Sequence, residues 1–412
     1  MSEKPASIVP LLARALNRIR SNPPRCIASP PTQPRRAAVA LIIRVVPPPH
    51  LVLNTEQPSS LADFFQLDWV NDPAARPEIL FLQRENPAPE DSGMSRVRNN
   101  NEAHVAFPGG RTEADDEGGL YTAMRQTWEE IGIDLAEKDY TCVGQLDDRE
   151  ITTSLGKRLL MILSPFVFLQ VTPHAGMPDP APATTLHWTP LASLVSAHPP
   201  PKWSNVTVDA ASRIAPKHST ALRLLVQALV GSMEFPAIIV EPSFVSPVTP
   251  DGKPAHDMEK GLKRPAQLKL WGLSLGMTLD LMSYMVHPLP AEPRSGSSSP
   301  LSPIMQLPYQ TGAEGIRMDI VAPSLASVFP RFSYPDVNFW IWVFGKRYRE
   351  VVRGWESSGS RHGSDPFSRI NWSGSALSTF YAAIRKALVL VIVARALGLI
   401  FGLGFAAWWV FQ

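Results

Sequence analysis

The residues with the clearest chemical potential lie between Gly109 and Asp134. Two glycines, Gly109 and Gly110, are followed by seven acidic residues between Arg111 and Asp134. Paired glycines let the backbone turn sharply and approach a ligand closely. Carboxylate oxygens are hard ligands that suit Mg²⁺ or Mn²⁺, cations that keep several waters and bridge to substrate phosphates. The stretch therefore predicts a site for a divalent cation and a phosphate group.

A helix is expected to carry the second half of this stretch, from about Gly118 to Ile131. Gly132 should end it, because glycine readily adopts the left-handed conformation that closes a helix. Apolar and small residues recur at the i, i+3, i+4 spacing of a buried helix face. That face is predicted to comprise Leu120, Ala123, Met124, Thr127 and Ile131.

Two pairs of polar residues should lie on one side of this helix. Arg125 and Glu129 are four residues apart, as are Gln126 and Glu130, so each pair can meet on the helix surface. The adjacent carboxylates of Glu129 and Glu130 repel each other unless a cation lies between them. The helix is thus expected to present both glutamates to a metal ion.

This stretch resembles a Nudix box, whose pattern is G-x5-E-x7-R-E-U-x-E-E-x-G-U with U an aliphatic residue. The positions that match in register are Glu117, Arg125, Glu129, Glu130, Gly132 and Ile133. Two positions depart from the pattern: one extra residue separates Gly110 from Glu117, and Gln126 stands where a glutamate is usual. The extra residue and the preceding segment from His104 to Gly110 are similar to the coenzyme A diphosphatase branch of Nudix hydrolases.

The resemblance implies an α/β (α+β) Nudix fold, with a mixed β-sheet sandwiched between helices, over about residues 36–286. It also implies hydrolysis of the diphosphate bond in a nucleoside diphosphate linked to another moiety, with coenzyme A or acyl-CoA as the leading candidate. The catalytic residues implied are Arg125, Glu117, Glu129 and Glu130. Glu129 and Glu130 would hold Mg²⁺ or Mn²⁺, with Asp116 or Glu117 as a further ligand. Arg125 would orient Glu129, while Gly109, Gly110 and Arg111 would contact phosphate.

Gln126 motivates a second hypothesis of a different class. An amide carries no charge, so the chain would then be a membrane-anchored nucleotide-binding protein that keeps the Nudix fold with weakened catalysis. Under both hypotheses the expected partner is a small molecule resembling coenzyme A. The formal net charge of +2 argues neither for nor against nucleic acid, and no nucleic-acid partner is expected. The sequence leaves the oligomeric state open.

Composition and the positions of proline- and serine-rich stretches divide the 412 residues into five parts. Residues 1–35 are basic and contain an amphipathic segment, read either as a mitochondrial presequence or, by preference, as a short helix leading into the domain. The Nudix domain follows over 36–286, closed by a helix around 270–278 and carrying an insertion at about 199–265. Residues 287–330 are a Pro/Ser-rich linker, 331–384 an aromatic-basic juxtamembrane region, and 385–412 a transmembrane anchor.

Within the domain, strands are expected at 36–45, 78–84, 140–146, 158–171 and around 185–188. Residues 86–101 are polar and read as a loop beside the site. Asp147, Asp148 and Glu150 join two strands. They supply either a further metal ligand or water-activating base, or only a solvated turn.

The last 26 residues, 387–412, are apolar apart from Arg395 and Gln412, long enough to cross a bilayer core of about 30 Å. Arg385 and Lys386 precede this run and would keep the domain on the cytosolic side. Arg395 is expected to snorkel toward them. The rival interpretation is a buried core helix. The organelle stays open, with the mitochondrion and the peroxisome both compatible.

Beside this run, an aromatic patch at 339–344 is followed by Lys346, Arg347, Arg349 and Arg353. It either lies at the membrane interface or packs on the domain as an amphipathic helix.

Overall fold

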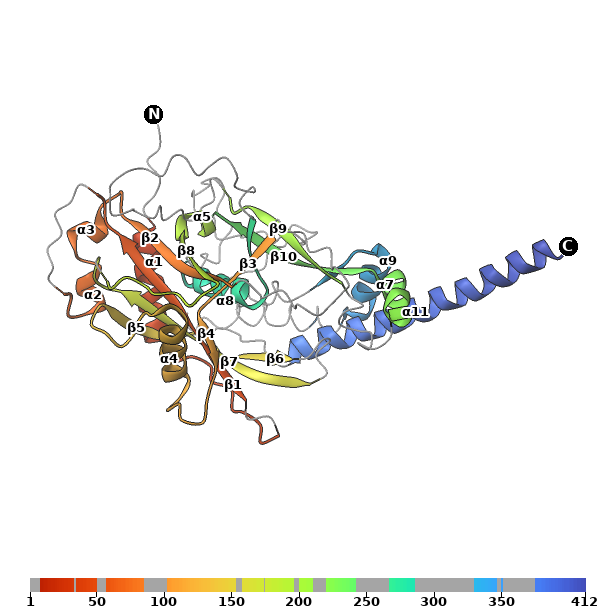
Figure 1. Cartoon of the computed structure of the whole chain (residues 1–412), viewed down its shortest axis with the longest axis horizontal. Coiled ribbons are helices and arrows are strands. Elements are labelled where there is room, and N and C mark those ends of the chain that lie inside the picture. Colours follow the sequence, from red (N-terminus) through yellow and green to blue (C-terminus); the bar gives the residue numbers. More distant parts are fainter. Residues whose placement is uncertain are drawn as a thin grey trace, which may run out of the picture.

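A computed structural model describes residues 8–32, 35–49, 57–84, 102–152, 158–173, 175–195, 200–209, 220–241, 267–285, 330–346, 350 and 375–412. Its centre is a mixed twelve-stranded β-sheet with helices on both faces (Figure 1). The strands are β1 Arg36–Val46, β2 Arg76–Arg84, β3 Glu102–Ala106, β4 Gly109–Arg111, β5 Tyr140–Gln145, β6 Arg149–Thr152, β7 Leu159–Gln170, β8 Thr184–Pro190, β9 Trp203–Asp209, β10 Ser232–Val240, β11 Gln267–Trp271 and β12 Arg331–Phe332. The helices are α1 Val9–Ser21, α2 Leu61–Phe64, α3 Asp68–Asn71, α4 Gly119–Ile131, α5 Leu191–Val195, α7 Thr220–Val230, α8 Gly272–Met285, α9 Pro335–Phe344 and α11 Ser375–Val410.

Strand β1 runs through the middle of the sheet. It pairs in parallel with β7 and antiparallel with β2 and β4. Its residues from Ala40 to Ile43 are all fully buried, as expected for a strand covered on both faces. Along the sheet the order is β12-β10-β11-β3-β2-β1-β7-β5. The predicted mixed sheet between helices is therefore confirmed.

Helices cover the two faces of the sheet and form two apolar cores. On one face α4 packs through Ala123 and Ile131 against Ile42 and Phe168. On the other face α1 and α8 pack in one apolar core, to which α1 contributes Leu16 and α8 contributes Leu279. The face with α4 carries the candidate site, so β1 and β4 provide the platform on which that helix rests.

Helix α1 belongs to this core. Leu12, Ala15 and Leu16 are fully buried, and Val9 and Ile19 are nearly so. The preferred interpretation of the N-terminal segment, a short helix leading into the domain, agrees with this packing.

The segment predicted as an insertion contributes strands to the main sheet, which sequence periodicity did not predict. β9 and β10 pair antiparallel over seven residue pairs, and β10 continues to β11, which lies parallel to β3. Pro236, which has no N–H to donate, sits inside β10 opposite Asn205. The closing helix also begins later than predicted, at Gly272, because residues 267–271 form β11.

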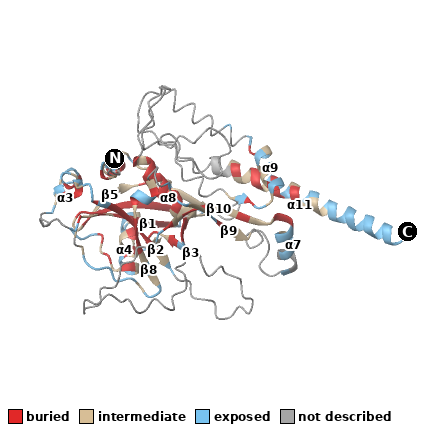
Figure 2. Cartoon of the chain, turned by 90° about the horizontal axis from the view of Figure 1, so that it is seen from above, coloured by how far each residue is buried: buried red, intermediate tan, exposed pale blue. Residues whose placement is uncertain are grey.

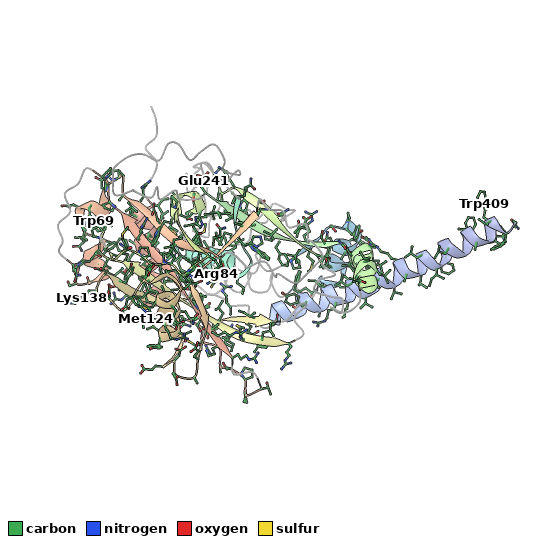
Figure 3. All side chains as sticks on the ribbon, in the orientation of Figure 1. Trp69, Arg84, Met124, Lys138, Glu241 and Trp409 are labelled. Atoms are coloured by element: carbon green, nitrogen blue, oxygen red, sulfur yellow. The ribbon has the colours of Figure 1, made fainter. Side chains whose placement is uncertain are left out.

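A third apolar core lies at the outer end of the sheet. There α7, α9 and the first half of α11 meet, with Val230, Val337, Ile384 and Leu388 at its centre. Beyond this core α11 extends away from the rest of the molecule, and its far end, marked by Trp409, is exposed (Figures 2 and 3). The span from Thr379 to Val410 is long and apolar enough to cross a membrane. The aromatic segment predicted to be juxtamembrane is partly helix α9. Residues 347–349 and 351–374 lie outside the described residues, as does the predicted linker at 287–330 except for its last residue.

The prediction that Arg395 snorkels toward Arg385 and Lys386 is wrong. Its guanidinium binds both carboxylate oxygens of Asp336 at 2.7 and 2.6 Å. It also donates to the Leu229 carbonyl at 2.5 Å and lies 4.3 Å from the centre of the Tyr334 ring. Arg395 therefore fastens α11 to α9, at the point where the helix leaves the domain.

Candidate active site

The two glycines form a short strand where a turn was predicted. Gly109, Gly110 and Arg111 make up β4, which pairs with Ala37, Ala38 and Val39 of β1. Gly109 has a φ of 147°, and a Cβ there would lie 2.4 Å from the Ala38 carbonyl oxygen. Only glycine lets β4 approach β1 this closely in that conformation. The expected close approach of bare backbone is present, but its partner is β1.

Helix α4 follows the prediction closely. It ends at Gly132, whose φ of 66° is left-handed and whose N–H donates to the Trp128 carbonyl at 2.9 Å. Ala123, Thr127 and Ile131 are buried as predicted. Leu120 is exposed and Thr122 is buried in its place. The hydroxyl of Thr122 donates to Asp116 at 2.9 Å, so a polar contact sets this end of the helix.

Arg125 is the hub of the site. Its Nε and Nη2 donate to the two oxygens of Asp116 at 2.7 and 2.8 Å. Its Nη1 donates to both oxygens of Glu129 at 2.9 and 3.1 Å, as the predicted orienting role requires. The Arg125 guanidinium holds the pKa of Asp116 well below its ordinary value, and Asp116 in turn raises the pKa of Arg125. Asp116 is therefore ionised and fixes the arginine that orients Glu129.

The two acids at the start of the box differ in their surroundings. Asp116 has a side chain only 2% exposed, with Arg125 on both oxygens. Glu117 is exposed, and no side chain in the described part of the chain pairs with it. The acid that supports Arg125 is thus Asp116, although Glu117 is the one that matches the box. This arrangement favours Glu129 and Glu130 over Asp116 as metal ligands.

Gln126 lies against the glycine strand. A Cβ on Gly110 would fall 2.0 Å from the Gln126 side-chain oxygen, so the amide occupies the space that a side chain would need. The amide nitrogen donates to Glu129 Oε2 at 3.0 Å. A glutamate at this position has no proton to donate and would repel Glu129. Gln126 and Arg125 therefore hold Glu129 between them.

Glu130 meets a residue that the sequence did not single out. Arg84, at the end of β2, donates from Nη2 to Glu130 Oε2 at 2.7 Å and from Nε to Oε1. The Gly109 N–H points to the same Oε2 at 3.5 Å. In Figure 3 Arg84 lies within the large domain, to the upper right of Met124. The sequence did contain one indication that Arg84 belongs to the site: it is a charged residue at the end of a predicted core strand, just before the polar stretch expected to lie beside the site.

Among the three acids after β5, Asp148 is a buried structural residue, and so it is neither a metal ligand nor part of a solvated turn. Residues 149–152 form strand β6 beside β7. Asp148 is fully buried. Its carboxylate accepts hydrogen bonds from Arg36 at 2.7 Å, the Ile27 N–H at 2.9 Å, Ser164 at 2.7 Å and Gln145 at 2.8 Å. Asp147 accepts from the Arg25 N–H at 2.9 Å. Both oxygens of Asp148 accept hydrogen bonds, so this carboxylate lacks the open position that a water-activating base needs.

The carboxylates of Glu129 and Glu130 have the chemistry that a divalent cation needs, and each of them already forms an ion pair with an arginine. Among the described residues no three His, Cys, Asp or Glu side chains converge on one point. Glu129 and Glu130 are adjacent carboxylates, and each is compensated by an arginine. Hard oxygen donors of this kind suit Mg²⁺ or Mn²⁺. The predicted loop at 86–101, which follows Arg84 almost directly, lies outside the described residues.

No protein-family model matches this chain. The chain is similar to an uncharacterized protein of Schizosaccharomyces pombe, with 29% identity over 216 residues. The match covers 52% of this chain and 58% of that protein, so the chain spans less than two thirds of this relative's length.

Solved structures that resemble the chain are Nudix and MutT proteins. One is a MutT/nudix family protein from Enterococcus faecalis, with 12% identity, a TM-score of 0.22, and coverage of 38% of this chain and 44% of that chain. Another is an Ap4A hydrolase from C. elegans, with 16% identity, a TM-score of 0.23, and coverage of 38% and 80%. A third is a Nudix hydrolase from M. smegmatis, with 17% identity, a TM-score of 0.20, and coverage of 37% and 68%.

Proposed function

We propose that this chain is a metal-dependent hydrolase that cleaves the diphosphate bond of a nucleoside diphosphate linked to another moiety, with coenzyme A or acyl-CoA as the leading substrate. The observation that carries the proposal is the pair of adjacent glutamates on α4, each held by its own arginine, beside the bare backbone of β4. Such a site provides oxygen ligands for a cation, and cations and backbone N–H groups for phosphate.

Each residue of the site has a role in this proposal. Glu129 and Glu130 would hold Mg²⁺ or Mn²⁺. Arg125 orients Glu129 and is itself fixed by Asp116. When bound, the cation neutralises the diphosphate and lowers the pKa of the attacking water. The backbone of β4 and the exposed Arg111 would face the phosphates.

Coenzyme A is favoured as the substrate by three features that resemble the coenzyme A diphosphatase branch. One is the spacing of the box, with an extra residue before Glu117. The others are the segment from His104 to Gly110 and the closing helix, which is α8. Incubation of the purified protein with coenzyme A, NADH and ADP-ribose in Mn²⁺ tests the choice. Coenzyme A is expected to turn over fastest, and faster turnover of ADP-ribose would replace it as the substrate.

A nucleotide-binding protein with weakened catalysis is the second candidate, favoured by the contacts of Gln126. Gln126→Glu is expected to tighten Mn²⁺ binding and raise turnover several-fold, because it adds a third carboxylate beside Glu129. Mn²⁺ titration and initial rates measure both effects. If neither the original protein nor the Gln126→Glu variant turns over any compound of the panel, while both bind nucleotide, the binding protein is the better description.

We further propose that α11 anchors the chain in a membrane, with the large domain on the cytosolic side. The contacts of Arg395 with Asp336 and Leu229 show where the chain can be cut to test the anchor, namely just after Arg395. Deleting residues 396–412 keeps the third core and the Arg395–Asp336 pair, and is expected to move the protein from the membrane pellet to the soluble fraction. An unchanged melting temperature in detergent is the control. Continued sedimentation with membranes would assign the attachment to α9, whose Phe339 and Trp342 are exposed.

A further inference from the structure

The two arginines that hold the glutamates are fastened very differently. Arg125 has a side chain 16% exposed and binds Asp116 through two hydrogen bonds, besides the Arg111 carbonyl at 3.3 Å. It therefore stays in place if Glu129 changes partner. Asp116 cannot release it readily, since both of its oxygens and the Thr122 hydroxyl take part in the same network.

Arg84 has far less support. Its side chain is 43% exposed. Apart from Glu130, its contact in the described part of the chain is a 3.3 Å hydrogen bond to the Phe107 carbonyl. The Glu130 carboxylate thus accounts for most of what keeps this guanidinium in the site. If that carboxylate binds a cation instead, Arg84 is free to turn toward solvent or toward a ligand.

We propose that Arg84 is a gate on the cation site: Arg84 and the divalent cation compete for Glu130, and the released guanidinium then binds the phosphate oxygens of the substrate. This inference rests on the proposed function. A guanidinium has parallel N–H donors that match two oxygens of a carboxylate or of a phosphate equally well. Arg84 therefore exchanges one anionic partner for another of the same geometry.

Such an exchange couples the two ligands. With no phosphate present, a cation that takes Glu130 leaves Arg84 without an anionic partner, so the cation binds weakly. With a diphosphate present, Arg84 gains a new partner and the cation binds more tightly. By linkage the cation strengthens diphosphate binding by the same factor. The gate thus discourages the site from holding a cation when there is no substrate.

The test is Mn²⁺ binding to the full chain in detergent, measured by calorimetry, with Arg84→Met compared with Arg76→Met. Arg76 is exposed at the opposite end of β2, so its variant loses the same charge away from the site. Arg84→Met is expected to bind Mn²⁺ about fivefold more tightly, since a partly exposed charge pair has been removed. ADP binding in saturating Mn²⁺ is expected to weaken about tenfold, because one charge-assisted contact is lost. Arg76→Met should change neither.

The expected changes in Mn²⁺ and ADP affinity have opposite directions, and this distinguishes a gate from a residue that only supports the fold. If Arg84 only holds the fold together, its variant weakens Mn²⁺ and ADP binding alike, and the gate is rejected. Unchanged Mn²⁺ affinity, or a failure of both proteins to bind Mn²⁺, rejects it too, since removing Arg84 did not open the site. If Mn²⁺ binding tightens and no diphosphate compound is hydrolysed, the competition for Glu130 stands and the proposed hydrolase fails.

Discussion

Glu130→Gln is expected to lower kcat for diphosphate hydrolysis by about 10²–10³-fold, the loss typical of removing one group that stabilises transition-state charge. The substitution keeps the shape of the side chain and removes its charge. Glu130 is the proposed cation ligand beside Arg84 and the Gly109 N–H. Weaker Mn²⁺ binding should accompany the loss, so rates must be measured across a Mn²⁺ titration.

A matched change outside the site provides the control. Glu137 is exposed and lies after the end of α4, and Glu137→Gln removes the same charge from the same region. Its rate is expected to stay within about twofold of the original, as for an ordinary surface change. A Glu130→Gln enzyme that retains full kcat at saturating Mn²⁺ would show that this carboxylate is not a ligand in the reaction.

Asp148→Ala is expected to destabilise the fold by about 3–5 kcal/mol, the cost of breaking a buried, hydrogen-bonded charge pair by removing one partner. The substitution leaves the Ile27 N–H, Ser164 and Gln145 without this acceptor and removes the carboxylate that the Arg36 guanidinium binds. For a domain of this size the melting temperature should fall by roughly 10 °C. Thermal unfolding followed by circular dichroism measures the shift.

Asp147→Ala is the control for this prediction. Asp147 is the adjacent residue, but its carboxylate receives a hydrogen bond from the exposed Arg25 N–H at the surface. Its loss is expected to shift the melting temperature by no more than a few degrees, within the range of ordinary surface substitutions. Equal effects of the two variants would mean that Asp148 is not the centre of a buried network.

The parts of the site that could be predicted from sequence are those set by local spacing. Helix α4 ends at Gly132 because a left-handed residue closes it, and Arg125 reaches Glu129 because the two are four residues apart. Both relations lie within one helix. The mixed sheet was likewise predictable from the apolar runs that became β1 and β7, since strands covered on both faces are continuously apolar.

Contacts made across the chain could not be predicted in this way. Arg84 precedes Glu130 by 46 residues and meets it only because β2 ends beside α4. Arg395 binds Asp336, which lies 59 residues earlier in the chain, whereas the anchor interpretation had placed its side chain toward Arg385 and Lys386. Asp148 lies in a run of charged residues that reads equally well as a solvated turn. Its burial follows from contacts with residues more than 110 positions earlier in the chain, the Ile27 N–H and the Arg36 guanidinium.

The most direct test of the proposed hydrolase is the product pattern of coenzyme A incubated with the purified full chain and Mn²⁺, read by phosphorus NMR. Cleavage of the diphosphate bridge predicts that its two coupled signals disappear and that two phosphomonoester signals appear in equal amounts. The reaction should depend on Mn²⁺ and be nearly absent in Glu130→Gln. Intact diphosphate signals for coenzyme A, NADH and ADP-ribose, in a folded sample that binds Mn²⁺, would contradict the proposed hydrolase.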